Sequence, residues 1–278
     1  MYALEIENLS YSYPDHTPAL QGITLKVKEA KKTAILGTNG SGKTTLIYHI
    51  NGLVPAQQGC VKVGGRIINK ANVNDIRRMV GLLFDNPDNQ LFSTTVFSDI
   101  AFGPRNLKLD EVEVAVRVNS MLADLGIIEL AEKPPFSLSL GQKKKAAIAG
   151  LMAMDPQLLA FDEPFSGLDP VAANQFRTLL DQLISRGKTL LYSTHDVDLA
   201  YAWADEVVVM KKGSILEEGP IDLLQDEELM KKASLQLPVL ARLFKKSNYY
   251  PRTVEEAALL LEKGVMHVEK PGETSTFI

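Results

Sequence analysis

One short stretch of the sequence restricts the fold more than any other. Gly37-Thr38-Asn39-Gly40-Ser41-Gly42-Lys43-Thr44 follows an apolar segment at residues 33–36 and precedes residues 44–50, which have helical character. In the spacing Gly-x-x-x-x-Gly-Lys-Thr, successive backbone N–H groups wrap a phosphate, the lysine reaches its oxygens and the threonine hydroxyl meets Mg²⁺. The stretch therefore predicts a phosphate-binding loop between a strand and a helix.

Three further apolar segments have the character of strands buried on both faces of a sheet. They span residues 82–84, 158–161 and 189–193, and polar residues follow each of them. In open α/β sheets, ligands bind at the carboxyl ends of the strands. Asp162 is suited to hold Mg²⁺ through water, and Glu163 is then placed to polarise an attacking water. A strand ending in Asp-Glu is also common as a plain solvated strand end, but the phosphate loop favours the functional interpretation.

The rest of the chain divides into an antiparallel edge, a helical insertion and a C-terminal part. Residues 3–9 and 23–27 alternate apolar and polar side chains, as strands at the edge of an antiparallel sheet do. Between about residues 92 and 154, helical periodicity predicts a helical subdomain. Short amphipathic helices follow the last strand signals, so we expect an α/β domain at 1–221 and a small α-rich extension at 222–278.

The composition excludes several classes of protein. With 30 basic and 34 acidic residues the net charge is −4, which offers no overall attraction for nucleic acid or an anionic membrane. Cys60 is the only cysteine, which fits a cytoplasmic location. The first residues do not resemble a signal peptide, and the longest apolar run, about residues 146–154, is far shorter than the ~20 residues that span a bilayer. If the protein works at a membrane, we expect other chains to cross it.

In motif order, residues 3–220 resemble ATP-binding-cassette (ABC) ATPases. The matching motifs are Walker A at 37–44, the signature motif Leu138-Ser139-Leu140-Gly141-Gln142, Walker B at 158–162 followed by Glu163, the D-loop Ser166-Gly167-Leu168-Asp169 and the switch region Ser193-Thr194-His195-Asp196. The resemblance implies an α/β P-loop NTPase core that binds ATP with Mg²⁺. It also implies hydrolysis, with Glu163 activating water, His195 contacting the γ-phosphate and Asp85 at the Q-loop position.

The resemblance further implies that two cassettes share each nucleotide site. The expected nucleotide-binding residues are Tyr13, Gly37, Asn39, Gly40, Ser41, Gly42, Lys43, Thr44, Thr45, Ser139, Gly141 and Gln142. Tyr13 has the position of an aromatic that stacks on adenine, although an ordinary strand aromatic is the alternative. Thr44, Asp85 and Asp162 are expected at Mg²⁺. Ser139 and Gly141 serve the γ-phosphate of the opposite subunit from a helix N-terminus, so the working unit is a homodimer or heterodimer.

A narrower resemblance points to energy-coupling factor (ECF) transporters, which import vitamins, cobalt or nickel. Residues 80–92, Val-Gly-Leu-Leu-Phe-Asp-Asn-Pro-Asp-Asn-Gln-Leu-Phe, are similar to their Q-loop segment, and residues 237–244 and 253–257 to their C-terminal extension. The resemblance implies that a transmembrane scaffold subunit contacts Asp88 to Phe92, that a separate membrane subunit binds the solute and that the extension contacts other subunits. Core filling is the alternative for Leu91 and Phe92. The expected location is the cytoplasmic face of the cell membrane.

Three positions depart from the family's pattern. Asp85 replaces the Q-loop glutamine, Leu140 replaces the first signature glycine, and Lys145 stands where arginine is common. A carboxylate is a good Mg²⁺ ligand, but Asp85 adds a negative charge near the γ-phosphate. Leu140 adds bulk beside the anion-binding turn. We hypothesise slow hydrolysis, or pairing with a cassette that carries the usual residues.

Two other functions stay open at this point. A soluble ABC protein of DNA repair or translation normally carries two cassettes or a long coiled coil, and the sequence shows neither. A low-turnover, ATP-dependent interaction module is disfavoured by Glu163, because a mere sensor does not need a general base. The leading hypothesis is the ATP-hydrolysing subunit of an ECF-type importer, without a nucleic-acid partner. The solute is open, because in such systems a different chain selects it.

Overall fold

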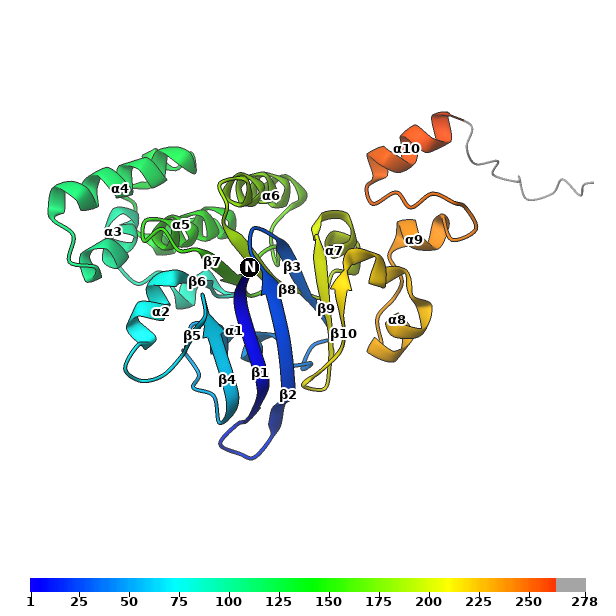
Figure 1. The fold of residues 1–278 in the computed structure, drawn as a ribbon. Coiled ribbons are helices and arrows are strands. Elements are labelled where there is room, and N and C mark those ends of the chain that lie inside the picture. The colour runs from blue at the N-terminus through cyan, green and yellow to red at the C-terminus, as the bar shows by residue number, and fades with distance from the viewer. Residues whose placement is uncertain (264–278) are drawn as a thin grey trace, which may run out of the picture.

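The computed structural model describes residues 1–263, so the last part of the expected extension, residues 264–278, lies outside the description. Among the described residues, a four-stranded antiparallel sheet has the order β2-β1-β4-β5, and a six-stranded sheet has the order β10-β9-β3-β8-β7-β6 (Figure 1). The strands are β1 (Tyr2–Ser12), β2 (Pro18–Lys28), β3 (Lys32–Leu36), β4 (Gln58–Val63), β5 (Arg66–Ile67), β6 (Val80–Leu83), β7 (Leu158–Phe161), β8 (Thr189–Thr194), β9 (Glu206–Lys211) and β10 (Ser214–Pro220). This arrangement confirms an α/β cassette with an antiparallel edge.

Helices flank the six-stranded sheet and fill the region between β6 and β7 (Figure 1). They are α1 (Lys43–Ile50), α2 (Val73–Met79), α3 (Val96–Asn106), α4 (Glu111–Asp124), α5 (Leu140–Met152), α6 (Pro170–Ser185), α7 (Val197–Trp203), α8 (Glu227–Ala233), α9 (Val239–Leu243) and α10 (Val254–Glu262), with 3₁₀ turns η1 (Pro87–Asn89), η2 (Ile128–Leu130), η3 (Pro135–Ser137) and η4 (Ile221–Gln225). Within residues 1–263, no helix combines the length and apolar character needed to cross a membrane.

The six-stranded sheet separates two hydrophobic cores. Ile35 of β3 packs in a core with α1 and the antiparallel sheet, whereas its neighbours Ala34 and Leu36 pack in a core with α3, α5, α6 and α7. Successive side chains of a strand point to opposite faces, so a strand between two cores is apolar at every position. This explains why the central strands appear in the sequence as unbroken apolar runs.

The parallel register brings the ends of the central strands to one edge. Leu36, the last residue of β3, pairs with Thr194 of β8, and Phe161, the last of β7, pairs with Tyr192 of the same strand. The phosphate loop, Asp162 and His195 each follow directly after one of these strand ends. The sheet therefore determines where the functional residues meet.

The helical subdomain, predicted at about residues 92–154, contains α3, α4 and α5. Helix α5 begins at a capping box, in which the Ser139 hydroxyl accepts a hydrogen bond from the Gln142 N–H at 3.4 Å and the Gln142 side chain accepts one from the Ser139 N–H at 3.0 Å. Two residues of the expected signature motif, Ser139 and Gln142, thus fix the start of this helix.

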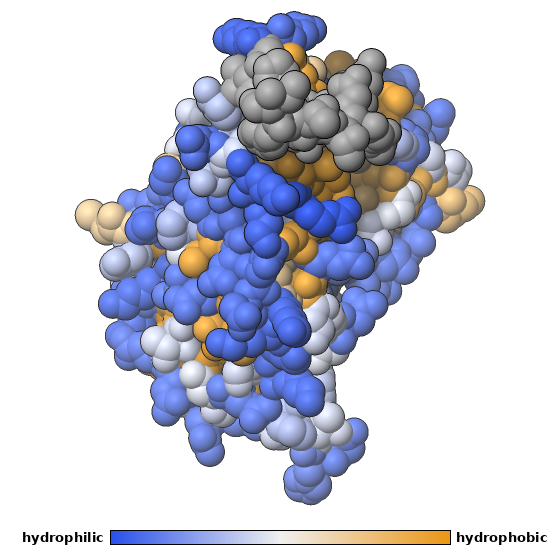
Figure 2. All heavy atoms as spheres, turned by 90° about the vertical axis from the view of Figure 1, so that its right-hand side faces the viewer, coloured by the Kyte–Doolittle hydropathy of each residue, from blue (hydrophilic) through white to orange (hydrophobic). Residues whose placement is uncertain are grey.

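The first elements after β10, η4 and α8, pack against β9 and β10 at one edge of the six-stranded sheet. Leu224, Leu229 and Met230 are buried in the same core as the central strands. Several apolar side chains of this part are exposed, among them Val239, Leu243, Val254 and Leu259. Figure 2 shows this side of the molecule, with apolar side chains gathered in its upper half. A domain boundary at residue 221 stays a prediction.

The C-terminal part forms hydrogen bonds with both ends of α7. The Asp198 carboxylate in the first turn of α7 accepts a hydrogen bond from the Val239 N–H at 2.6 Å. At the other end, Arg252 Nε donates to the Tyr201 carbonyl at 2.8 Å, and its guanidinium also donates to the Ala204 carbonyl. A cation at a helix C-terminus satisfies carbonyls that lack partners within the helix and interacts favourably with the helix dipole.

We expect Arg252→Ala to lower the free energy of unfolding by about 1–3 kcal/mol, because it leaves the carbonyl groups at the end of α7 without these partners. Urea unfolding of the full chain, followed by circular dichroism, measures the shift. Arg242→Ala is the matched control, since Arg242 is exposed on the neighbouring α9. Equal midpoints for the two variants would show that the Arg252 contacts do not hold the extension.

Candidate nucleotide site

The phosphate loop ends in a helix whose N-terminus is open. Gly42, the residue before α1, has a left-handed backbone with φ of 103°, and no side chain caps the helix. A Cβ at Gly42 would lie 2.7 Å from the Ala19 carbonyl oxygen, so both the backbone angle and the space require glycine. The first N–H groups of α1 are therefore left for an external anion.

Lys43 is the first residue of α1, and its side chain folds back into the phosphate loop. Its side chain is 7% exposed, and its Nζ donates to the Gly37 carbonyl at 2.8 Å and lies 3.8 Å from a carboxylate oxygen of Glu163. Burial lowers the pKa of Lys43, and the charges of Glu163 and Asp162 oppose that shift. The loop thus holds a cation at the point where a phosphate group would enter.

A cavity of about 450 Å³ opens beside this loop. Its lining consists of Tyr13, Thr17, Pro18, Ala19, Asn39, Gly40, Ser41, Gly42, Lys43, Thr44, Thr45, Asp85, Asp162 and Glu163. The Tyr13 hydroxyl is hydrogen-bonded to the Thr45 hydroxyl at 2.6 Å, which places this aromatic ring at the cavity. Gly37 does not line the cavity. A Cβ there would lie 2.5 Å from Ser41 Oγ, so this glycine allows the loop to pack closely.

Asp162 is buried at the end of β7. The Ser193 hydroxyl of β8 donates to its carboxylate at 2.5 Å. Burial raises the pKa of Asp162, hydrogen bonds from Ser193 and Thr44 oppose the shift, and the nearby Asp85 and Glu163 charges add to it. A bound cation would stabilise the ionised form. The Thr44 hydroxyl and the Asp162 carboxylate therefore suit a Mg²⁺ ion that accompanies a phosphate.

Glu163 lies between the phosphate loop and the switch region. Both of its carboxylate oxygens lie 3.1 Å from His195 Nδ1, and one of them also lies 3.8 Å from Lys43 Nζ. Its backbone has φ of 43°, in the left-handed region, and its N–H donates to the Ser193 hydroxyl at 2.9 Å. The same hydroxyl thus fixes both acidic residues. A carboxylate held between Lys43 and His195 is suited to accept a proton from a water beside a phosphate.

Asp85 and Leu140, two of the unusual residues, line one hollow. It has a volume of about 430 Å³, adjoins the phosphate-loop cavity and is lined by Asn39, Asp85, Asn86, Leu140, Glu163, Ser166, Gly167 and His195. A Cβ at Gly167, whose φ is 72°, would lie 2.6 Å from a Leu140 methyl group. Leu140 therefore packs on the D-loop of its own chain. Asp85 is a third carboxylate in the site beside one buried lysine.

Three expected nucleotide contacts lie apart from the phosphate loop. Ser139, Gly141 and Gln142 line a separate groove with Leu168 and Ala172 and do not line the cavity beside Lys43. Within one chain the structure thus does not bring these three residues to the phosphate loop, although Leu140 of the same motif lines a hollow with Asn39. Their expected contact with the nucleotide of a second subunit stays a prediction.

Sequence reasoning missed two residues that hold the site in place. The Ser193 hydroxyl is hydrogen-bonded to both Asp162 and Glu163. The sequence feature that could have indicated it is a polar side chain near the carboxyl end of a buried strand. Lys144 is fully buried and donates to carbonyl oxygens of the segment after Glu163. Nothing in its local pattern distinguishes it from its two lysine neighbours, so it was not predictable from spacing.

An open helix N-terminus, a buried lysine and two adjacent acidic residues at the end of β7 define a site for a phosphate group with a metal ion, as in a nucleotide-binding cassette. Residues 20–166 match the ABC transporter family. An energy-coupling factor transporter ATP-binding protein, EcfA, of Carboxydothermus hydrogenoformans is 45% identical over 94% of this chain and 98% of its own length. EcfA of Methanocaldococcus jannaschii is 46% identical over 87% of this chain and 88% of its own length. The chain belongs to the energy-coupling factor transporter ATP-binding proteins within the ABC transporter family.

Solved structures agree with this assignment. The structure of cbiO1 from Clostridium perfringens, described as part of the ABC transporter complex cbiONQ, is 39% identical and has a TM-score of 0.75 over 88% of this chain and 99% of its own. A dimeric ATP-binding cassette in a post-hydrolysis state, bound to ADP and Pi, is 25% identical with a TM-score of 0.71 over 78% of this chain and 98% of its own. Family membership implies ATP binding, with Mg²⁺ as its usual companion.

We expect Asp85→Gln to raise ATP turnover by roughly threefold to tenfold, because it removes a negative charge from the hollow beside Glu163 where the γ-phosphate would develop charge. Leu140→Gly should raise it further by removing bulk beside the D-loop. Steady-state phosphate release from the purified chain measures both effects. Asp75→Asn removes an equal charge from the exposed face of α2 and serves as control. A turnover that neither Asp85→Gln nor Leu140→Gly changes would rule out the slow-site hypothesis.

Proposed function

We propose that this chain is the ATP-hydrolysing subunit of an ECF-type importer, in which a cassette dimer drives uptake of a micronutrient through separate membrane subunits. The observation that carries the proposal is the position of the Glu163 carboxylate, between Lys43 and His195 at the mouth of an open phosphate loop. Cobalt, nickel and the vitamins are the candidate solutes. The protein would lie at the cytoplasmic face of the membrane.

In the proposed mechanism, each residue has a separate task. The N–H groups of α1 and Lys43 bind the phosphates, and the Tyr13 ring stacks on the adenine. Mg²⁺, held through Thr44, Asp162 and Asp85, would neutralise charge that develops on the phosphates. Glu163 accepts a proton from the attacking water, while His195 moves from Glu163 to the γ-phosphate. The second subunit completes the site with its own Ser139, Gly141 and Gln142.

We expect Glu163→Gln to lower kcat by about 10²-fold to 10⁴-fold, because the amide cannot accept the proton. ATP binding should persist, and ATP should trap a dimer that size-exclusion chromatography detects. Glu217→Gln is the control, since Glu217 is exposed on β10. Unchanged turnover in Glu163→Gln would remove Glu163 from the role of base.

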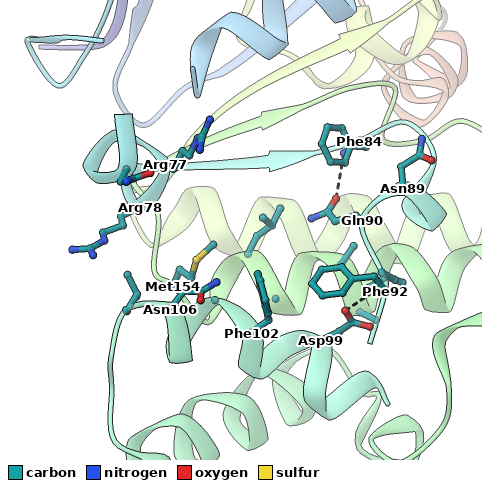
Figure 3. Close-up of a pocket in the computed structure, with 18 residues that line it drawn as sticks. Arg77, Arg78, Phe84, Asn89, Gln90, Phe92, Asp99, Phe102, Asn106 and Met154 are labelled. Carbon is teal, nitrogen blue, oxygen red and sulfur yellow. Dashed lines mark hydrogen bonds between the residues drawn. The ribbon is translucent and has the colours of Figure 1, made fainter. Parts of the chain in front are cut away.

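A groove beside the Q-loop supports contact with a transmembrane scaffold subunit. It has a volume of about 600 Å³ and is lined by residues of the Q-loop segment, α2, α3 and α5. Phe92 is 68% exposed and lies edge-on to Phe102, with ring centroids 4.9 Å apart. Figure 3 shows these two rings in the groove, with Arg77 and Arg78 at the end far from Phe92. Core filling is therefore wrong for Phe92, whereas Leu91 packs partly against the core.

The other residues of this segment have contacts within the chain. The Asp88 carboxylate pairs with Lys143 Nζ at 2.6 Å, so the Q-loop is tied to the signature helix α5. A scaffold element that enters the groove would press on Phe92 directly and on α5 through Asp88. The exposed apolar residues of the C-terminal helices favour a further contact, with the second ATP-binding subunit.

Purification of the tagged protein from its native membrane should recover the scaffold and solute-binding subunits. We expect Phe92→Asp to abolish this recovery while the purified chain keeps its ATP turnover, because a charge would enter the apolar groove. Val112→Asp, on the exposed start of α4, should leave recovery unchanged. Recovery of nucleic-acid-associated proteins would favour a soluble role in repair or translation. Equal recovery in both variants would remove the groove from the interface.

A further inference from the structure

Three consecutive lysines follow the signature motif on α5 and have different surroundings. Lys143 forms the ion pair with Asp88, and Lys145 lines the groove near Ser139. Lys144, between them, has no exposed surface. Lysine is rarely fully buried unless its ammonium group has strong partners. The complete burial of Lys144 therefore needs a physical explanation, whereas its two lysine neighbours are not fully buried.

The partners of Lys144 are backbone carbonyls of a single loop. Its Nζ donates to the Pro164 oxygen at 2.7 Å and the Ser166 oxygen at 2.8 Å, and it lies 3.4 Å from the Glu163 oxygen. Burial lowers the pKa of Lys144 to about 8, and the charges of Asp85 and Glu163 oppose this shift. All three donor positions of the ammonium are thus directed at the loop that begins with Glu163.

That loop starts from a backbone conformation that needs support. A non-glycine residue in the left-handed region is strained and persists only where its surroundings impose it. Glu163 has φ of 43°, and its peptide groups are held from two sides. The Ser193 hydroxyl accepts from its N–H, and Lys144 approaches its carbonyl oxygen. Further along, Lys144 holds the carbonyl of Ser166, at the start of the D-loop.

We propose that Lys144 is a positioning residue, which fixes the loop of Glu163 to the signature helix and thereby sets the orientation of the Glu163 carboxylate. The proposal rests on the role of Glu163 in the proposed function. Ser139 caps the N-terminus of α5 and lines the groove that is expected to receive the nucleotide of the second subunit. A displacement of α5 therefore moves the carbonyl partners of Lys144 and, with them, the base of the chain's own site. One helix links the two sites of a dimer.

Kinetics of the full chain test this role. We expect Lys144→Met to lower kcat by about tenfold to a hundredfold, because a shift of about 1 Å in a reacting group has an effect of that size. The KM for ATP and the binding of a fluorescent ATP analogue should change by less than about twofold, since Lys144 does not line the nucleotide cavity. Lys133→Met is the control, because Lys133 is an exposed lysine of the same helical subdomain, and it should keep the turnover of the wild type.

A double variant separates a positioning role from a general loss of structure. In the Glu163→Gln background, Lys144→Met should lower kcat by less than about twofold, because the group through which Lys144 acts is already absent. A full additional loss in that background would overturn the proposal. If Glu163→Gln itself leaves kcat unchanged, the proposed function of Glu163 is wrong, and the following measurement decides the role of Lys144 without it.

Hydrogen exchange of the nucleotide-free chain reports the loop directly. Lys144→Met should increase exchange in the peptide that spans residues 163–169, while Lys133→Met should not. Wild-type protection of this peptide in Lys144→Met would overturn the proposal even if turnover falls. If Lys144→Met does not fold, Lys144→Arg decides. This variant keeps a charged donor and should retain both protection and more than about a third of the wild-type kcat, and loss of both would contradict the proposal.

Discussion

The parallel register of β3, β8 and β7 is the constraint on which the rest of the site depends. Because Leu36 pairs with Thr194 and Phe161 pairs with Tyr192, the strands end at nearly the same level. The phosphate loop, the acidic pair and His195 then begin at one edge without any long connection. A single hydroxyl, that of Ser193, contacts both Asp162 and the Glu163 N–H across two strands. A shift in strand register would separate all of these groups at once.

The electrostatics of the site follow from this crowding. Asp85, Asp162 and Glu163 line one cavity with Lys43, so carboxylates outnumber the buried cation. Burial is the main cause of the raised pKa of Asp162, and the charges of Asp85 and Glu163 add to it. A divalent cation would add positive charge to this cavity, and a polyphosphate entering with it would add negative charge. For this reason the site is matched to a metal–nucleotide complex better than to either component alone.

The sequence predicted the fold well because its signals were local. The glycines and Lys43 define a loop by spacing alone, and the buried strands show unbroken apolar runs. The position of Phe92 was not decidable, because an aromatic beside an apolar residue has the same local pattern in a core and in an open groove. Lys144 was missed for the same reason, since its burial results from a loop that lies about 20 residues away in the sequence. Contacts of this kind depend on tertiary packing, which spacing does not record.

The hydrogen bonds between the C-terminal part and α7 affect the order in which the parts of the site form during synthesis. The hydrogen bonds that anchor this helix join residues 41 and 51 positions apart, Asp198 to Val239 and Tyr201 to Arg252. His195 directly precedes the cap of α7. During synthesis from the N-terminus, the phosphate loop and its partner strands leave the ribosome well before Arg252 does. The nascent cassette therefore possesses a phosphate loop before Arg252 can anchor the helix that follows His195.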